Sequence, residues 1–425
     1  MPKKSVISLC VSALLAACAV TPPPPSPTAT AAAVTPSPSA PRLVSPTPAG
    51  SLTTNLRVWL PPQYAPDDSA AGGKVLAEQI ARFEQTHPGQ AVEIRIKSVS
   101  GPGGLLESLA TAYNAAPAVL PDVVALDRND LVAAASAGLV IPLDNLLPPD
   151  VLADYYPFAQ TMSRHKDAIV GLPFAADARV LAYKTDLYAS PPQTWAEITT
   201  GTLIIPAGEA AGLTLLNEYL AMGGPLADPS GKTVLDAELL TEALAAFQTV
   251  HTSGWLPLST LAYSDTLSTW QVFRERRATL AVTNAQSFLS EPDRVAGAAA
   301  ALLPTGHGLP FALADGWCWA LVNTAAPQHQ VAVELLTWLT DPVQLSAWTR
   351  AAHVLPTRSA ALEGWGTDRL APFASDVLSH AHLQPSTEIL AAAGPPLQRA
   401  LDDVLNGRAT PFAAAAAASQ SVASP

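Results

Sequence analysis

The 425-residue sequence contains only three cysteines, too few for a disulfide framework. Cys10 lies in an N-terminal segment that we predict to be removed, and Cys18 in a motif that we predict to carry lipid. Cys318 would then be the remaining thiol, so no intramolecular disulfide is expected. Because tryptophans flank Cys318 in an apolar run, we expect a buried, inert thiol.

The sequence is also poor in basic residues, with 23 Lys and Arg against 35 Asp and Glu and a formal net charge of −12. Nucleic-acid binding needs a clustered basic surface. The densest basic stretch is 274–277, and its spacing indicates a solvated helix face. The sequence therefore excludes nucleic acid as a partner.

Near the N-terminus, the apolar run Val6 to Ala17 is too short to span a bilayer as a mature helix. Two lysines precede it, and the stretch 15–18 (Leu-Ala-Ala-Cys) resembles a lipobox, the cleavage site of bacterial lipoproteins. We therefore predict a signal peptide at 1–17, lipid on Cys18 and an extracytoplasmic, membrane-anchored protein. The alternative is an ordinary signal peptide with a chance cysteine.

The segment after Cys18 cannot form a packed core. Residues 18–51 are rich in Pro, Ser, Thr and Ala, a composition that favours extended, semi-stiff chain. We predict a tether here and a globular part that starts at 52.

Catalytic motifs are missing as well. The stretch 231–233 resembles the end of a P-loop, but Leu226 stands where that motif needs glycine. Neither G-x-S-x-G nor H-E-x-x-H occurs. His380 and His382 have no acidic or cysteine partner at metal-ligand spacing. We therefore expect no enzyme, no metal and no cofactor.

The hydrophobic pattern of the globular part is typical of an α/β protein. Strands are predicted near 56–60, 92–97 and 121–126, with helices near 75–83 and 105–113 between them. This order predicts a doubly wound, mostly parallel sheet. A second α/β lobe is expected over 195–305, and a returning strand over 313–322.

The stretch 171–188 is predicted to cross between the two lobes. Gly171 and a proline mark a turn, and an alternating strand follows Asp177 and Arg179. The spacing of Thr194 and a glutamate three residues later predicts a helix from Trp195. A ligand is expected beside the crossing, although a hinge salt bridge would equally explain the two charges.

Several segments, in order, carry a family resemblance. They are 83–88, Pro121 to Val124, 137–144, 171–187, 192–198, 273–282, 303–306, 341–344 and 406–411. Over about 55–418 the chain is similar to the extracellular solute-binding proteins of family 1, the sugar-type ligand receptors of bacterial ABC importers.

The resemblance implies a type II periplasmic-binding-protein-like fold, in which hinge strands join two α/β lobes with a ligand cleft between them. We expect 52–175 with 309–350 in lobe 1, and 176–308 with 351–425 in lobe 2. It also implies a monomer that captures a solute by lobe closure and delivers it to an ABC permease. The alternatives are a sensor or scaffold lipoprotein and, with less support, a tethered surface hydrolase.

The sequence departs from the family pattern at aromatic positions. The stretch 284–286 stands where many sugar binders place a tryptophan, and 394–396 replaces a frequent aromatic platform. We therefore expect a small polar solute, with a carbohydrate as the first choice, rather than a large oligosaccharide.

The candidate ligand-binding residues follow strands or lie at the crossing, where cleft loops of this fold meet. They are Tyr64, Asp127, Arg128, Asn129, Asp177, Arg179, Asn284, Gln286, Asp315 and Trp317. The amides suit sugar hydroxyls, and Trp317 could stack on a sugar ring. Helix capping at Asp127 or Asn129, turn formation at Asn284, Gln286 or Asp315, and an exposed loop position for Tyr64 are the structural alternatives.

Overall fold

The computed structural model describes residues 54–67, 69–291, 295–324 and 328–423. The predicted signal peptide, Cys18 and the tether lie outside these residues. The described residues form one compact unit, and no helix among them is both long and apolar enough to cross a membrane.

Within the described ranges, nine strands form one sheet, in the order β2-β1-β3-β10-β6-β8-β7, with β11 added to β10 and β9 to β6. Their bounds are β1 Thr54–Leu60, β2 Gln90–Ile96, β3 Val123–Asp127, β6 Leu172–Lys184, β7 Leu203–Ile204, β8 Leu280–Asn284, β9 Ala298–Ala301, β10 Ala312–Leu321 and β11 Ala381–Leu383. A separate hairpin pairs β4 Arg164–His165 with β5 Ala168–Ile169. The parallel β1, β2 and β3 confirm the predicted first half of the sheet.

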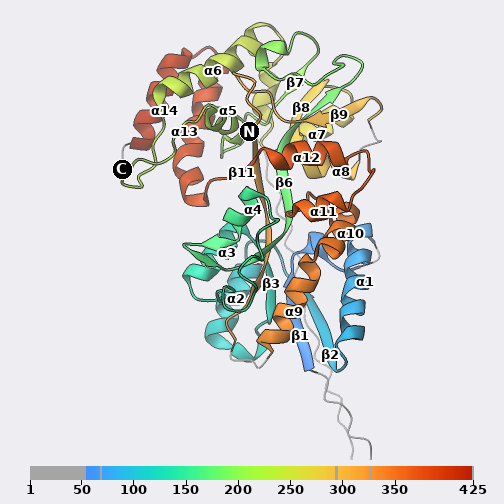
Figure 1. Cartoon of the computed structure of the whole chain (residues 1–425). Coiled ribbons are helices and arrows are strands. Elements are labelled where there is room, and N and C mark those ends of the chain that lie inside the picture. The colour runs from blue at the N-terminus through green and yellow to red at the C-terminus, as the bar shows by residue number, and fades with distance from the viewer. Residues whose placement is uncertain (1–53, 68, 292–294, 325–327, 424–425) are drawn as a thin grey trace, which may run out of the picture. The chain divides into compact units, whose positions relative to one another are not determined.

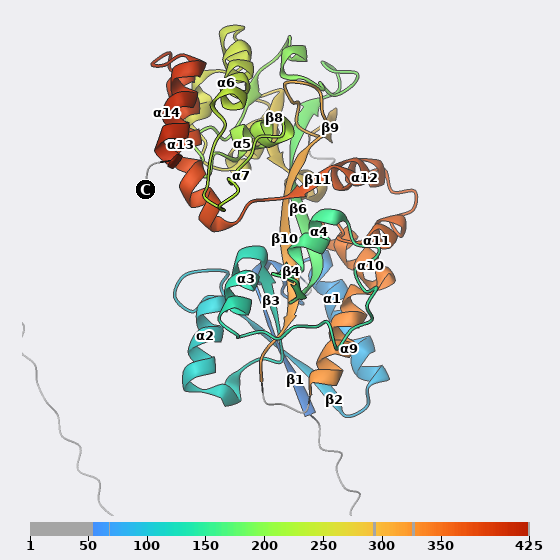
Figure 2. The same ribbon diagram turned by 60° about the vertical axis from the view of Figure 1, so that its left-hand side comes forward.

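The two longest strands, β6 and β10, join the halves of the molecule (Figure 2). β10 pairs with β3 near its end and with β6 along 314–319. β6 continues from that pairing to β8 and β9. We call the half with β1, β2 and β3 the first lobe and the half with β7, β8 and β9 the second lobe.

The predicted break before the crossing strand is absent, because β6 runs unbroken from Leu172 through Asp177 and Arg179. Pro173 lacks an N–H, but it lies opposite Cys318 beside the irregularity between Trp317 and Cys318, where a ladder bond can be spared. Every side chain of β6 except those of Asp177 and Lys184 is buried. A strand packed on both faces can therefore contain two charged positions without ending.

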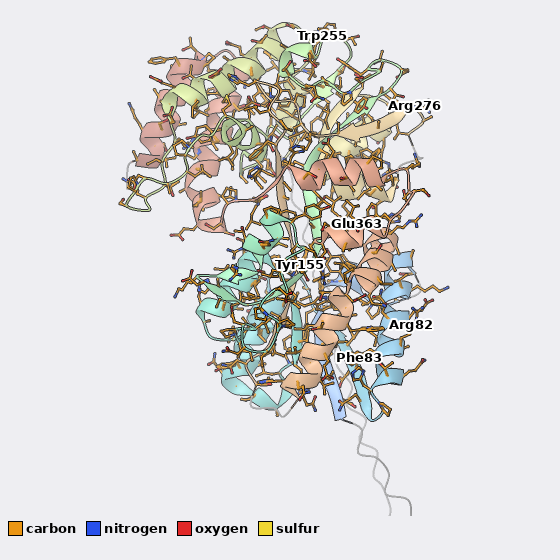
Figure 3. The ribbon with its side chains drawn as sticks, in the orientation of Figure 1. Arg82, Phe83, Tyr155, Trp255, Arg276 and Glu363 are labelled. Carbon is orange, nitrogen blue, oxygen red and sulfur yellow. The ribbon has the colours of Figure 1, made fainter. Side chains whose placement is uncertain are left out.

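Helices cover both faces of the sheet (Figure 1). They are α1 Ala71–Thr86, α2 Leu105–Ala115, α3 Arg128–Ser136, α4 Pro157–Met162, α5 Leu213–Ala221, α6 Ala237–Thr252, α7 Thr266–Arg274, α8 Ala285–Ser290, α9 His329–Thr340, α10 Pro342–Ala352, α11 Ser359–Glu363, α12 Ala371–Ser379, α13 Thr387–Leu405 and α14 Pro411–Ala423. On α1, Phe83 is fully buried and the side chain of its neighbour Arg82 is 60% exposed (Figure 3). This alternation between core and solvent is that of an amphipathic helix.

The predicted helix from Trp195 is only a single 3-10 turn, Trp195–Glu197. The expected capping box does not form: Thr194 makes no side-chain cap bond, and Glu197 accepts from the backbone N–H of Gln193, one residue before Thr194, at 2.8 Å. The buried Trp195 indole instead donates to Glu218 at 2.7 Å. A tertiary contact thus fixes this segment where local capping predicted a helix.

Each lobe has its own large hydrophobic cluster. Leu56, Phe174 and Leu336 belong to the first, and Leu216 and Phe247 to the second. The buried Cys318 packs in a further cluster of the first lobe, as its apolar neighbours predicted. Neighbouring residues of β6 divide between the two large clusters, so both lobes share this strand.

The packing differs from the predicted division in one segment. We expected 351–425 in the second lobe, but Leu355 and Leu378 pack in the cluster of the first lobe. α13 and α14 do pack in the second. α12, which carries Leu378, also contacts β9 of the second lobe, and β11 after it pairs with β10. The other predicted boundaries stay predictions.

Candidate ligand-binding site

A cavity of about 410 Å³ lies beside the middle of β6 and β10, where the two lobes meet. Its lining includes eight of the ten residues named from the sequence: Tyr64, Asp127, Asp177, Arg179, Asn284, Gln286, Asp315 and Trp317. They come from β3, β6, β8 and β10, from the 3-10 turn after β1 and from the first turn of α8. The sheet thus brings together side chains up to 253 positions apart, from Tyr64 to Trp317.

Strand register explains why these residues share one face. Trp317 on β10 lies between Asp127 of β3 and Ala175 of β6. Two residues away, Asp315 lies opposite Asp177. Side chains two apart on a strand point to the same face. One side of the sheet therefore carries an aromatic ring and three carboxylates.

Gly316 allows β10 to lie this close to its neighbour. A Cβ atom at this position would lie 2.2 Å from the carbonyl oxygen of Ala175 and 3.1 Å from the terminal methyl of Met162. Any other residue would push β10 away from β6. The glycine thus sets the position of Asp315 and Trp317 on either side of it.

Arg179 forms a buried ion pair with Glu209, not with Asp177 as a hinge salt bridge would require. The side chains of Arg179 and Glu209 are 8% and 16% exposed. Arg179 also donates to the hydroxyl of Thr214 at 3.4 Å. Burial lowers the pKa of Arg179, and the charge of Glu209 opposes that shift. The pair joins β6 to the loop after β7.

Asp177 connects β6 to the start of α8. Its Oδ1 accepts from the backbone N–H of Gln286 and from that of Ala178, both at 2.9 Å. Burial raises the pKa of Asp177 to about 6, although these bonds, Asn284 and Arg179 oppose the shift. Asn284 lies opposite Arg179 in the β6–β8 ladder. Gln286 thus contributes its main chain as well as an amide side chain that lines the cavity.

Asp315 has a similar environment. Its Oδ1 accepts from the N–H of Gly316 at 2.8 Å. Burial, together with the charges of Asp127 and Asp177, raises its pKa to about 6, and the bond from Gly316 and the charge of Arg128 oppose this shift. Asp127 also caps α3, accepting from the N–H of Asp130 at 2.9 Å. Asp127 therefore caps α3 and also lines the cavity, although the sequence suggested these two roles as alternatives.

Aromatic rings form one wall. Tyr64 is 7% exposed, so it is not an exposed loop residue. Its ring makes edge contacts with those of Trp317, Phe174 and Trp348, at centroid distances of 5.6, 5.4 and 5.3 Å. Trp317 is partly exposed and lines the cavity, whereas Trp319 is in the core, as expected. An aromatic face and polar groups therefore meet in one cavity.

Arg128 and Asn129 do not line this cavity. They border a neighbouring cavity of about 450 Å³ between α3 and the start of α13. Asn129 accepts from the backbone N–H of Thr387 at 3.2 Å. Arg128 acts on the main cavity only through its charge near Asp315. The two residues follow the same strand as Asp127, but the helical turn of α3 directs them to another side.

Sequence reasoning missed several lining residues, among them Gln63, Glu209, Asp265, Thr266 and Gln384. Asp265 accepts from the N–H of Ser268 at 2.7 Å, so a search for helix caps could have found it. Glu209 lies in a loop and has no local sequence signal. No cluster of metal-ligating side chains occurs in the described ranges. The arrangement is suited to hydrogen bonding, charge pairing and ring contact.

Two lobes that share strands, with a polar cavity beside those strands, define the type II periplasmic-binding-protein fold. Residues 78–377 match the family described as bacterial extracellular solute-binding protein, and the chain belongs to that family. Its place of action is therefore outside the cytoplasm.

Two curated relatives are similar in sequence. A probable ABC transporter-binding protein of Deinococcus radiodurans is 26% identical over 281 residues, 58% of this chain and 66% of that protein. A maltotriose-binding protein of Pyrococcus abyssi is 25% identical over 293 residues, 64% of this chain and 62% of the relative. The chain thus spans less than two thirds of the length of each.

Solved structures share the fold. The cyclic alpha-maltosyl-1,6-maltose binding protein of Arthrobacter globiformis has a TM-score of 0.71 at 19% identity, covering 87% of this chain and 98% of its own. The sugar-binding protein MalE of Xanthomonas citri has a TM-score of 0.70 at 21% identity, covering 87% and 96%. At these identities the likeness concerns the fold.

Proposed function

We propose that this protein binds a carbohydrate in the cavity beside β6 and β10 and delivers it to the permease of an ABC importer. The observation that carries the proposal is the meeting of Trp317 with the polar groups of Asp177, Arg179 and Asn284 in one cavity. A ring face and convergent donors and acceptors are what a small polyhydroxylated solute needs. One relative is named a maltotriose-binding protein, which supports the same class of ligand. The other is named a probable ABC transporter-binding protein, which supports a role with an importer.

The site acts by binding alone in this proposal, with no covalent step. The lobes would close on the solute by bending at β6 and β10, because among the described strands these two long ones connect both halves of the sheet. Lipid on Cys18 and the tether at 18–51 would hold the monomer near the permease. The predicted ligand contacts are the eight cavity-lining residues named from the sequence.

A thermal-shift and calorimetric screen of the full chain tests the function. We expect glucose, maltose or maltotriose to raise the melting temperature, because a ligand that binds only the folded state stabilises it by mass action. A shift with amino acids, polyamines or polyols, and none with any sugar, would overturn the carbohydrate proposal. The lipid anchor is tested separately with the Cys18→Ser variant. We expect this variant to be released from membranes and the protein with Cys18 to be retained on them.

A further inference from the structure

The cavity has an excess of negative charge. Five carboxylate side chains line it: Asp127, Asp177, Glu209, Asp265 and Asp315. Arg179 is the one cation among the described lining residues, and it is already ion-paired with Glu209. Neither lysine nor histidine contributes to this lining. A neutral sugar would leave most of this negative charge uncompensated.

Two of the carboxylates have an evident structural role. Asp127 accepts from the N–H of Asp130 at the start of α3, and Asp265 accepts from the N–H of Ser268 at the start of α7. Orphan N–H groups and the helix dipole stabilise negative charge at such positions. Capping therefore accounts for these two, but not for Asp177 and Asp315.

Asp177 and Asp315 lie directly opposite each other on antiparallel strands. Like charges in that relation destabilise a sheet. Arg179 and Arg128 are the cations near the pair, but for both carboxyl groups burial outweighs the cations, and each pKa is raised to about 6. Oδ1 of Asp177 accepts from two backbone N–H groups and Oδ1 of Asp315 from one, and the Asn284 side chain also bonds Asp177. The protein itself thus leaves this pair incompletely compensated.

Two further polar groups at the cavity have no partner among the described residues. The hydroxyl of Tyr64 makes no hydrogen bond although the residue is only 7% exposed, and its pKa is raised by burial and by the charge of Asp177. Oε2 of Glu209 is buried and also without a hydrogen bond. Buried polar groups are normally satisfied, so these positions point to a ligand with hydrogen-bond donors.

We propose that the solute is a small sugar that carries a protonated amine, held between the carboxylates of Asp177 and Asp315. This inference rests on the proposed function, because it specifies which carbohydrate the cavity selects. An ammonium group supplies three donors and a positive charge, whereas a hydroxyl supplies one donor and no charge. The face of Trp317 is a further favourable surface for a cation.

Matched sugars test the inference on the full chain. Glucose and maltose are the neutral probes, and glucose with an amine in place of the 2-, 3- or 6-hydroxyl supplies the charged ones. Affinity is measured by calorimetry at pH 7.5. We expect at least one amino sugar to bind roughly tenfold more tightly than glucose, the gain typical of a hydrogen bond to a charged group.

Variants then locate the effect. Asp177→Asn and Asp315→Asn keep the side-chain shape and remove one charge each, and both are expected to abolish the preference for the amine. Asp186→Asn is the matched control, because Asp186 is exposed and outside the cavity lining. Circular dichroism confirms that each variant folds.

The outcomes separate the two proposals. If neutral sugars bind as tightly as every amino sugar, the inference fails and the carbohydrate function stands. An amine preference that survives both cavity variants also overturns it, since the pair would not be its source. Absence of binding by any sugar, neutral or charged, overturns the carbohydrate function together with the inference.

Discussion

Asn129 and Thr387 join the two lobes through one hydrogen bond. The side-chain oxygen of Asn129, in the first turn of α3, accepts from the backbone N–H of Thr387, in the first turn of α13, at 3.2 Å. α3 packs against β3 and β10 of the first lobe, and α13 packs in the cluster of the second. The bond lies beside a cavity that borders the proposed site.

Substituting Asn129 by alanine is expected to free the amide of Thr387. Losing a hydrogen bond worth about 1 kcal/mol should speed hydrogen exchange at this amide roughly fivefold. Native-state exchange measured by NMR checks this. Asn114→Ala is the control, because Asn114 bonds only the carbonyl of Ala110 within α2. Unchanged exchange at Thr387 would show that the contact contributes nothing in solution.

Trp317→Ala is expected to weaken sugar binding about tenfold while the chain stays folded. The ring lines the cavity, and an aromatic contact contributes on the order of 1 kcal/mol beyond its buried area. Trp317→Phe should recover part of the affinity, since a ring face remains. Trp255→Phe serves as the distant control, at the top of the view in Figure 3. Equal affinities for all three variants would exclude Trp317 as a contact.

Glu209→Ala is expected to lower the free energy of unfolding by about 3 kcal/mol, because it leaves the buried guanidinium of Arg179 without its partner. Urea unfolding monitored by fluorescence measures the loss. Glu78→Ala is the matched control: the Glu78–Arg82 pair is 51% and 60% exposed and should contribute less than about 1 kcal/mol. Similar losses in both variants would argue against a special role for the buried pair.

The carboxyl of Asp315 should make stability depend on pH. Its pKa is about 6 in the folded chain against 3.8 as the ordinary value, so it holds its proton more strongly when folded. The contribution of this carboxyl to folding stability is fully present below pH 3.8 and is lost as the pH rises through 6. Asp315→Asn should therefore raise the melting temperature relative to the parent more at pH 7.5 than at pH 4.5. A difference on the order of 2 kcal/mol is expected between these pH values.

Melting curves at both pH values, with Asp186→Asn as the control, check this. The charged groups that share the region are Asp127, Asp177, Arg128 and Arg179. Because like charges repel each other mutually, removing the charge of Asp315 also relieves Asp127 and Asp177 at pH 7.5, which acts in the same direction. A stabilisation by Asp315→Asn that is equal at the two pH values would contradict the assignment.

Much of the sheet and most of the candidate site could be predicted from the sequence. The alternation of apolar residues correctly predicted β1, β2 and β3. Asp127 and Asn284 were predicted as cavity residues because side chains at the ends of strands reach the cleft in this fold. The pairing of Asp315 with Asp177 needed the register of strands that lie 138 positions apart, which no local pattern contains.

Other features depend on tertiary contacts. The ion pair of Arg179 with Glu209 joins a strand to a loop, and neither neighbourhood signals the other. The capping-box spacing at Thr194 predicted a helix, but the bond between the Trp195 indole and Glu218 decided the local structure. Local propensity is a weak guide wherever a buried polar contact competes with it.

The place of β10 in the sheet also sets an order for biosynthesis. β10 is the neighbour that both β3 and β6 require, yet it is encoded far behind them, at Ala312–Leu321. Until residue 321 leaves the ribosome, β3 and β6 each have an open edge where β10 will later lie. Residues of β10 also line the cavity, so a nascent chain can complete this cavity only after β10 has been made.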